Sequence, residues 1–354
     1  MMSENSKKHR RAEMTELHVE NQGLTELDLS PYPNLELLYC GNNKLSKLDL
    51  CYTPNLHKLW CPNNNITHLD FSSTPNLFMI GCDSNKLCEI DTSNLEYLEY
   101  LFCKNNKITS LDLRNNPYLL NIACDKNRLE NINIENNALL INLSCGENLL
   151  SEIFLSNKAR LEGLLCSENS IEKLDLYNKP RLQTLLCHDN KLQSIDLSNK
   201  SKIKHLSCGY NMIKALDIRD LLVLQHLSCN SNEITRLNLS KNRQLVSLYC
   251  QNNKISQLDL SNLNMLEEFA CSDNRLTHLD VSANSRLTSL YCHNNQLLTL
   301  GVVGAVKLTE LSCANNRITE LDLSQSIKLR DIDVSGNPIN DLDMTSTEIS
   351  KHIH

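Results

Sequence analysis

The chain has 354 residues, of which 41% are hydrophobic and only 5% aromatic, and its formal net charge at pH 7 is -7. An acidic chain of this kind lacks the basic stripe that neutralises phosphates, which argues against nucleic acid as a partner. No run of residues approaches the roughly 18 apolar residues that a membrane-spanning helix requires, which argues against a membrane protein.

The first residues, 1–13, are predicted to form a polar tail or cap. The opening stretch "MMSENSKKHRRAEM" is charged and has no apolar segment, so it is not typical of a cleaved secretory signal. Without such a signal we expect the chain in the cytoplasm of the producing cell. In a long chain of this class its sixteen cysteines are expected to be reduced thiols.

Cysteine then recurs every 21 residues from Cys40 to Cys313, and only Cys51 and Cys88 lie outside this series. One further position at each end keeps the flanking pattern, which gives about sixteen coils over residues 14–344. Self-similarity at a fixed period of this length is the mark of a solenoid, in which each coil buries its leucines against its neighbours.

Each coil reads approximately LxxLxCxxNxLxxLDLSxxPx. Apolar residues alternate with other types around the cysteine and again in "LDL", which predicts two short extended segments with one buried face each. The remaining residues leave no room for a helix of ten residues or more. One position of the repeat is predicted to lie in a turn, where the missing N–H of a proline does little harm. Five prolines occupy it, Pro33, Pro54, Pro75, Pro117 and Pro180.

This motif resembles a leucine-rich repeat, and its 21-residue form with a second "LxxLDL" half is similar to the bacterial subclass called IRREKO-type repeats. The resemblance implies a right-handed leucine-rich repeat solenoid with a parallel β-sheet on one face and a second extended or β face. Because both faces are extended, we expect little or no helix and weak curvature. Residues 345–354 are expected to form a short C-terminal tail.

The repeated polar columns have structural interpretations. The cysteines are predicted to fill tight interior positions, and the asparagines three residues later to bond backbone groups of their own turn and the next coil. The aspartates of "LDL" are predicted to accept local N–H bonds in Asx-type turns. A calcium-binding ladder is the alternative use of these aspartates. No "CxxC" pair occurs, and we expect neither a metal site nor a cofactor.

Residues that bind a partner are expected at the positions beside the cysteine, where the residue type varies from coil to coil. These outward positions gather aromatic residues and their neighbours, which is typical of a binding hot spot, although aromatic residues also favour strand surfaces for their own packing. The predicted binding residues are Tyr39, Lys58, Trp60, Tyr100 and Phe102, with a second patch at Tyr249, Gln251, Tyr291 and His293. Acidic residues outnumber lysines on this surface, which favours a partner of basic and apolar character.

Two further departures from the pattern are noted. His205 and His226 share an outward column on adjacent coils and would make half of a metal site, or two solvated surface histidines. In the stretch "LGVVGAVKL", residues 300–308, small apolar residues replace the aspartate and the polar turn. This departure is interpreted either as a local contact patch or as a tolerated variation.

No catalytic motif occurs in the sequence. The repeat resemblance therefore implies a non-enzymatic module that binds a protein along the cysteine-bearing strand face. The bacterial form of the repeat favours a virulence effector that is translocated into a host cell without a signal peptide. The alternative is a structural or calcium-binding rod. We expect a monomer, with end-to-end association through the exposed strand edges left open.

Overall fold

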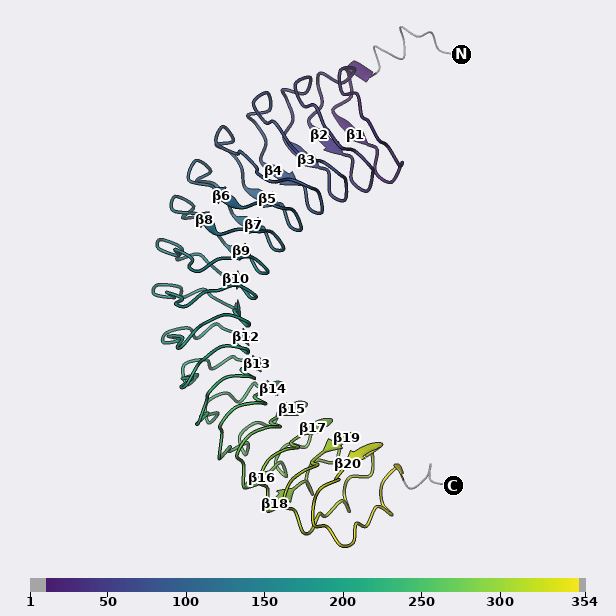
Figure 1. The fold of residues 1–354 in the computed structure, drawn as a ribbon, viewed down its shortest axis with the longest axis vertical. Coiled ribbons are helices and arrows are strands. Elements are labelled where there is room, and N and C mark those ends of the chain that lie inside the picture. Colours follow the sequence, from purple (N-terminus) through teal and green to yellow (C-terminus); the bar gives the residue numbers. More distant parts are fainter. Residues whose placement is uncertain (1–10, 350–354) are drawn as a thin grey trace. The chain divides into compact units, whose positions relative to one another are not determined.

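The structure, a computed structural model, describes residues 11–349 and comprises two compact units. The N-terminal unit is Met1–Ile171 with Tyr177–Lys179, and the C-terminal unit is Glu172–Leu176 with Pro180–His354 (Figure 1). Residues 1–10 of the predicted N-terminal tail and residues 350–354 of the predicted C-terminal tail lie outside the described residues. Within residues 14–349 the chain forms strands and turns without an α-helix, and no described helix is long and apolar enough to cross a membrane.

In the N-terminal unit each coil contributes one three-residue strand to a parallel sheet, which we call the main face. Neighbouring strands pair in register, 21 residues apart, as Leu38 opposite Leu59 illustrates. The strands are β1 (Glu16–His18), β2 (Leu37–Tyr39), β3 (Lys58–Trp60), β4 (Met79–Gly81), β5 (Tyr100–Phe102), β7 (Asn121–Ala123), β9 (Asn142–Ser144) and β10 (Gly163–Leu165).

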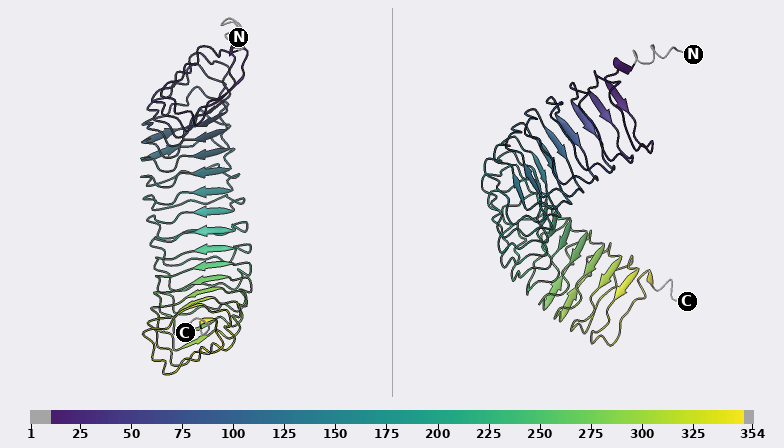
Figure 2. Two further views of the ribbon diagram at one scale, coloured as in Figure 1. Left: turned by 90° about the vertical axis from the view of Figure 1, so that its right-hand side faces the viewer. Right: turned by 45° about the horizontal axis from the view of Figure 1, so that its top comes forward.

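The C-terminal unit continues the same pattern. Its main-face strands are β11 (Thr184–Leu186), β12 (His205–Ser207), β13 (His226–Ser228), β14 (Ser247–Tyr249), β15 (Glu268–Ala270), β17 (Ser289–Tyr291), β19 (Glu310–Ser312) and β20 (Asp331–Asp333). Figure 2 shows the strands of each unit side by side, with the return segments of the coils opposite them. Over residues 11–349 the main-face strands number sixteen, one per coil, which confirms the predicted parallel-sheet solenoid.

Burial follows the period-two alternation of a strand. In each main-face strand from β1 to β19 the middle residue is buried, and Leu38 and Leu59 for example have no exposed surface. Burial of a leucine side chain stabilises the fold by about 1.5–3 kcal/mol, and the partner of each leucine lies in the adjacent coil. The first and third residues of each strand point outward and are free of this constraint.

The cysteine that follows each strand is part of the core. All fourteen cysteines of the 21-residue series are buried, while Cys51 and Cys88 are exposed, and all sixteen are free thiols. Burial raises the pKa of the buried thiols, to about 12 at Cys166 and Cys250. They are therefore neutral at physiological pH, which fits the predicted role as small apolar core residues.

The asparagine column links successive coils through both ends of each amide. Nδ2 of Asn274 donates to the carbonyl oxygens of Cys271, 3.1 Å away in its own coil, and of Cys250, 3.0 Å away in the preceding coil. Its Oδ1 accepts the N–H of Ile255, again in the preceding coil, at 2.9 Å. The prediction that these amides satisfy backbone groups is confirmed, except that the linked neighbour is the preceding coil and not the next one.

The opposite face of each coil, which we call the second face, carries the aspartate column. The Oδ1 atom of Asp70 accepts the N–H of Ser72 at 2.9 Å, and Asp91 and Asp259 accept the N–H two residues later in the same way. This geometry confirms the predicted Asx-type turns.

Strand pairing on the second face occurs at one place in each unit. The paired strands are β6 (Ser110–Asp112) with β8 (Asn131–Asn133), and β16 (His278–Asp280) with β18 (Thr299–Gly301). Elsewhere in residues 11–349 the predicted second extended segment forms no ladder with its neighbours. The alternation in "LDL" favours an extended backbone, but ladder bonds also need adjacent coils to approach to the strand spacing of about 4.8 Å.

Candidate interaction surfaces

The main face of the N-terminal unit carries a row of aromatic side chains, which we call the aromatic row. It includes Tyr39, Trp60, Tyr100 and Phe102 on strands β2, β3 and β5, all partly exposed. In-register pairing places residues 21 apart on neighbouring strands, so equivalent side chains lie about one strand spacing apart. The structure thus brings together the first set of residues that the sequence predicts.

Lys58 lies between two rings of the row. Its Nζ atom is 4.9 Å from the ring centroid of Tyr39 and 5.9 Å from that of Trp60, within the range of cation–π attraction. Tyr39 also stacks on His18, with ring centroids 4.4 Å apart and an interplanar angle of 7°. These contacts hold the rings in place within the chain.

Trp60 continues the row towards β5. Its ring lies across Gly81, where a Cβ atom would overlap the indole. It meets Phe102 edge to face at a centroid distance of 5.9 Å and an angle of 69°, and Phe102 lies 6.5 Å from Tyr100. Ring pairs of this kind contribute about 0.5–1.5 kcal/mol beyond their burial, so the row is a preorganised surface.

His18 and Met79 also belong to this surface and were not predicted. His18 lies on β1, 21 residues before Tyr39, and Met79 is paired in register with Lys58 and Tyr100. The further position at the N-terminal end of the 21-residue series is Val19, so the same count places His18 beside Tyr39. Met79 was missed because it is not aromatic, although it occupies the same position in its coil as Lys58 and Tyr100, which were predicted.

On the C-terminal unit, the predicted tyrosines bond to glutamates of the following coil. The hydroxyl of Tyr249 donates to Oε2 of Glu268, and that of Tyr291 donates to Oε2 of Glu310. Burial, together with the Glu268 carboxylate, raises the pKa of Tyr249 to about 12. The bond to Glu310 is the main cause of the raised pKa of Tyr291. Both phenols therefore stay protonated and act as donors.

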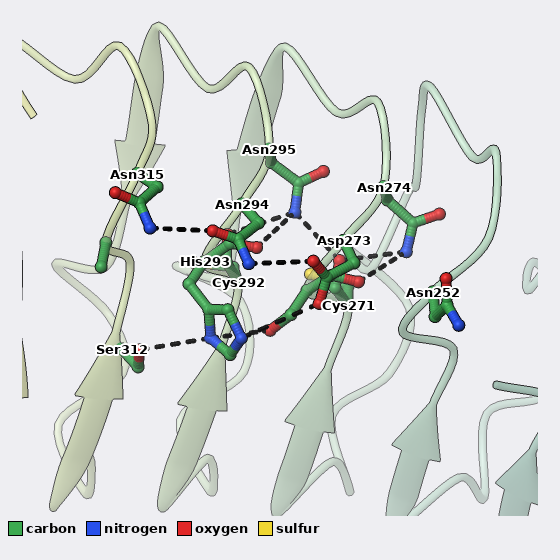
Figure 3. A network of polar contacts seen from close by, with 12 residues as sticks. Asn252, Cys271, Asp273, Asn274, Cys292, His293, Asn294, Asn295, Ser312 and Asn315 are labelled. Carbon is green, nitrogen blue, oxygen red and sulfur yellow. Dashed lines mark hydrogen bonds and ion pairs between the residues drawn. The ribbon is translucent and has the colours of Figure 1, made fainter. Parts of the chain in front are cut away.

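His293 lies in a polar network that crosses three coils (Figure 3). Its Nδ1 is 3.0 Å from Oγ of Ser272 and 3.3 Å from Oγ of Ser312, and its Nε2 is 3.9 Å from a carboxylate oxygen of Asp273. Gln251 lies after β14, and its Oε1 is buried without a hydrogen-bond partner among the described residues. His293 is held chiefly by its own neighbours.

His205 and His226 stack face to face, with centroids 4.9 Å apart and an angle of 5°. Nδ1 of His226 is 3.1 Å from Oγ of Ser247. Burial, and then the neighbouring His226, lower the pKa of His205, which favours a neutral ring. In residues 11–349 no group of three or more His, Cys, Asp or Glu side chains is arranged to hold a metal ion.

The second face has two features of its own. In the C-terminal unit the departure at residues 300–308 opens a hollow of about 600 Å³, whose lining includes Asp280, Gly301 and Asp322. In the N-terminal unit Phe154 is 64% exposed and lines a hollow of about 420 Å³ beside β8. Phe154 stands in the aspartate column, 21 residues after Asn133, so the register marks it as a departure that the sequence analysis missed.

The comparisons with known proteins agree with this architecture. The family description "Leucine Rich repeats (2 copies)" matches residues 306–346. The functional domain of InlJ from Listeria monocytogenes, which includes a cysteine ladder, is similar with a TM-score of 0.87. It is 32% identical, over 91% of this chain and 72% of that chain. The chain belongs to the leucine-rich repeat family.

Two other leucine-rich repeat structures share the fold at lower identity. The plant peptide hormone receptor RGFR1 in complex with RGF2 has a TM-score of 0.78 and 21% identity, over 87% of this chain and 56% of that chain. YopM, a leucine-rich effector protein from Yersinia pestis, has a TM-score of 0.66 and 23% identity, over 93% of this chain and 90% of that chain. No curated protein sequence matches the chain.

Proposed function

We propose that this leucine-rich repeat protein is a non-enzymatic interaction module that binds a protein partner along its main face. The aromatic row carries the proposal. Large rings that are partly exposed and already packed against one another offer contact area without much loss of rotamer entropy on binding. Ligands are named for proteins of the same fold, as in the complex of the RGFR1 receptor with RGF2.

The chemistry of the partner follows from the surface. The row offers ring faces and one cation, Lys58, which the rings already accommodate. A partner segment with apolar side chains and a lysine or arginine would use the same ring faces. Such a segment would replace the intramolecular contact of Lys58 with an intermolecular one.

We also propose the setting of a bacterial effector, made in the cytoplasm and delivered into a host cell. The similarity of fold to YopM, described as an effector protein, supports this setting. A reporter fusion that is active only in host cytoplasm tests it, with expression in the producing cell as the control. Absence of reporter activity in host cells that carry the expressing bacterium would contradict it.

Affinity capture tests the binding function directly. The wild-type chain is compared with the double variant Trp60→Ala, Phe102→Ala and with Phe154→Ala, which removes an exposed ring from the second face of the same unit. We expect the double variant to weaken binding of the captured partner by about thirtyfold or more, since the loss of a single central aromatic residue typically costs about 2 kcal/mol or more and such losses are not additive. Undiminished capture by the double variant would overturn the proposal.

A further inference from the structure

The tyrosine–glutamate bonds of the C-terminal unit repeat with a fixed period. Tyr249 on β14 bonds Glu268 on β15, and the same arrangement recurs 42 residues later, where Tyr291 on β17 bonds Glu310 on β19. We call these four residues the Tyr–Glu surface. Each tyrosine leans across the strand that follows its own, and a small residue, Ala270 or Ser312, lies opposite it there in register.

Each pair presents a ring and a carboxylate together. The hydroxyl donates to Oε2 of its glutamate, so the carboxylate is held in one direction while its Oε1 makes no other hydrogen bond among the described residues. A carboxylate fixed in this way accepts a guanidinium or ammonium group at little entropic cost. The ring beside it is a flat apolar contact of the kind that proline-rich segments use.

The charge of this part of the main face has one sign. The strands β14, β15, β17, β19 and β20 and the two residues after each contain no lysine or arginine, and they carry the carboxylates of Glu268, Glu310, Asp331 and Asp333. Arg330, at the margin, is paired with Glu348 at 2.6 Å. The surface is therefore complementary to a cationic segment.

The spacing selects the conformation of that segment. Two coils separate the equivalent carboxylates, which corresponds to about 9.6 Å at the parallel-strand spacing. One turn of a polyproline II helix, three residues at about 3.1 Å each, rises about 9.3 Å. A helix returns to the same face after seven residues and about 10.5 Å, and a strand after two residues and about 6.7 Å. The polyproline II repeat fits best.

We propose that the Tyr–Glu surface binds a protein segment in the polyproline II conformation that carries an arginine or lysine at every third residue. Successive cations pair with Glu268 and Glu310, and the prolines between them lie against Tyr249 and Tyr291. The inference rests on the proposed function in one respect, that the main face binds protein, and it does not involve the aromatic row.

Fluorescence anisotropy with the full chain and a labelled peptide of four Pro-Pro-Arg repeats tests the proposal. The comparison peptides are four Gly-Gly-Arg repeats, with the same charges on a flexible backbone, and a helical peptide with four arginines seven residues apart. We expect the Pro-Pro-Arg peptide to bind about tenfold more tightly than either, because its conformation is formed before binding. Equal affinity for Gly-Gly-Arg, or tighter binding of the helical peptide, would refute the proposal.

Variants locate the site. Glu268→Gln and Glu310→Gln are each expected to weaken binding of the Pro-Pro-Arg peptide by about fivefold. Glu320→Gln, which removes the same charge from the second face, should leave it unchanged. The Trp60→Ala, Phe102→Ala variant should also bind the peptide normally. Partner capture by this variant therefore tests the aromatic row alone, and peptide binding by the glutamine variants tests the Tyr–Glu surface alone. Unchanged affinity in both glutamine variants rules the surface out.

Discussion

The indole of Trp60 lies over Gly81, so the ring of one coil occupies the place of a side chain on the next. Aromatic residues of this column are followed 21 residues later by small ones in three other cases, Phe102 by Ala123, Tyr249 by Ala270 and Tyr291 by Ser312. The small residue makes room for a ring that leans forward. A ring that leans forward on this solenoid therefore needs two coils, one that supplies the ring and one that leaves space, whereas Tyr39, which lies opposite Trp60, stacks on His18 of the preceding coil.

Gly81→Ala should displace the Trp60 ring without disturbing the fold. Gly81 does not have a left-handed backbone conformation, so alanine is tolerated there except for its overlap with the indole. Because Trp60 is the only tryptophan, the emission spectrum reports it alone, and a red shift is expected as the ring loses Phe102 and meets water. Ser228→Ala, in the same column of the C-terminal unit, is the control. An unshifted spectrum for Gly81→Ala would show that the ring does not depend on the glycine.

The buried cysteine column predicts a characteristic thiol titration. With a disulfide reagent at pH 8 the native protein should show two reactive thiols, Cys51 and Cys88, and all sixteen after unfolding. The hydrogen bond to Asp49 raises the pKa of Cys51, which lowers its thiolate fraction, so Cys88 should react faster. The single variants Cys51→Ser and Cys88→Ser assign the two rates. Many fast thiols in the native state would contradict burial of the column.

The asparagine column should be costly to interrupt. Asn274→Ala removes the acceptor of the Ile255 N–H and the donor to the carbonyl oxygens of Cys250 and Cys271, all in the interior. Leaving such groups unsatisfied is expected to lower the free energy of unfolding by about 3–5 kcal/mol, measured by urea denaturation. Asn76→Ala, at an exposed turn position, should cost less than about 1 kcal/mol. Equal effects of the two substitutions would refute the structural role of the column.

The 21-residue period allows the solenoid to be predicted from the sequence because it fixes which side of the sheet each residue occupies. The burial of Leu38 and the outward position of Trp60 both follow from it. The direction in which an outward side chain leans does not follow, since it depends on rotamers and on the neighbouring coil. The bond from Tyr249 to Glu268 was missed for this reason, although the small Ala270 beside them was a usable signal.

Acid should lower the stability that the aspartate turns of the second face contribute to the fold. Hydrogen bonds from the residue two positions later hold the pKa of the column aspartates below the usual value, as at Asp70 and Asp91. A carboxyl with a lowered folded-state pKa stabilises fully above about pH 4 and loses this contribution as pH falls through its folded value. Asp70→Asn with Asp91→Asn keeps the local bond, as Asn238 does naturally, but removes the titration. Its urea midpoint should fall less than that of the wild type between pH 5 and pH 3. Parallel losses in both proteins would contradict this account.

Calcium provides the final test, because a calcium-binding rod is the main alternative to an interaction module. One oxygen of Asp70, Asp91 and Asp259 accepts a backbone N–H of its own turn, and within residues 11–349 no group of three or more His, Cys, Asp or Glu side chains is arranged to hold a metal ion. We expect the melting temperature to change by less than about 1 °C in millimolar calcium. A site filled at a hundred times its dissociation constant would instead add about 2.7 kcal/mol, or several degrees. Magnesium and a chelator are the controls. A rise specific to calcium, and absent from the Asp70→Asn, Asp91→Asn variant, would favour the rod over the interaction module.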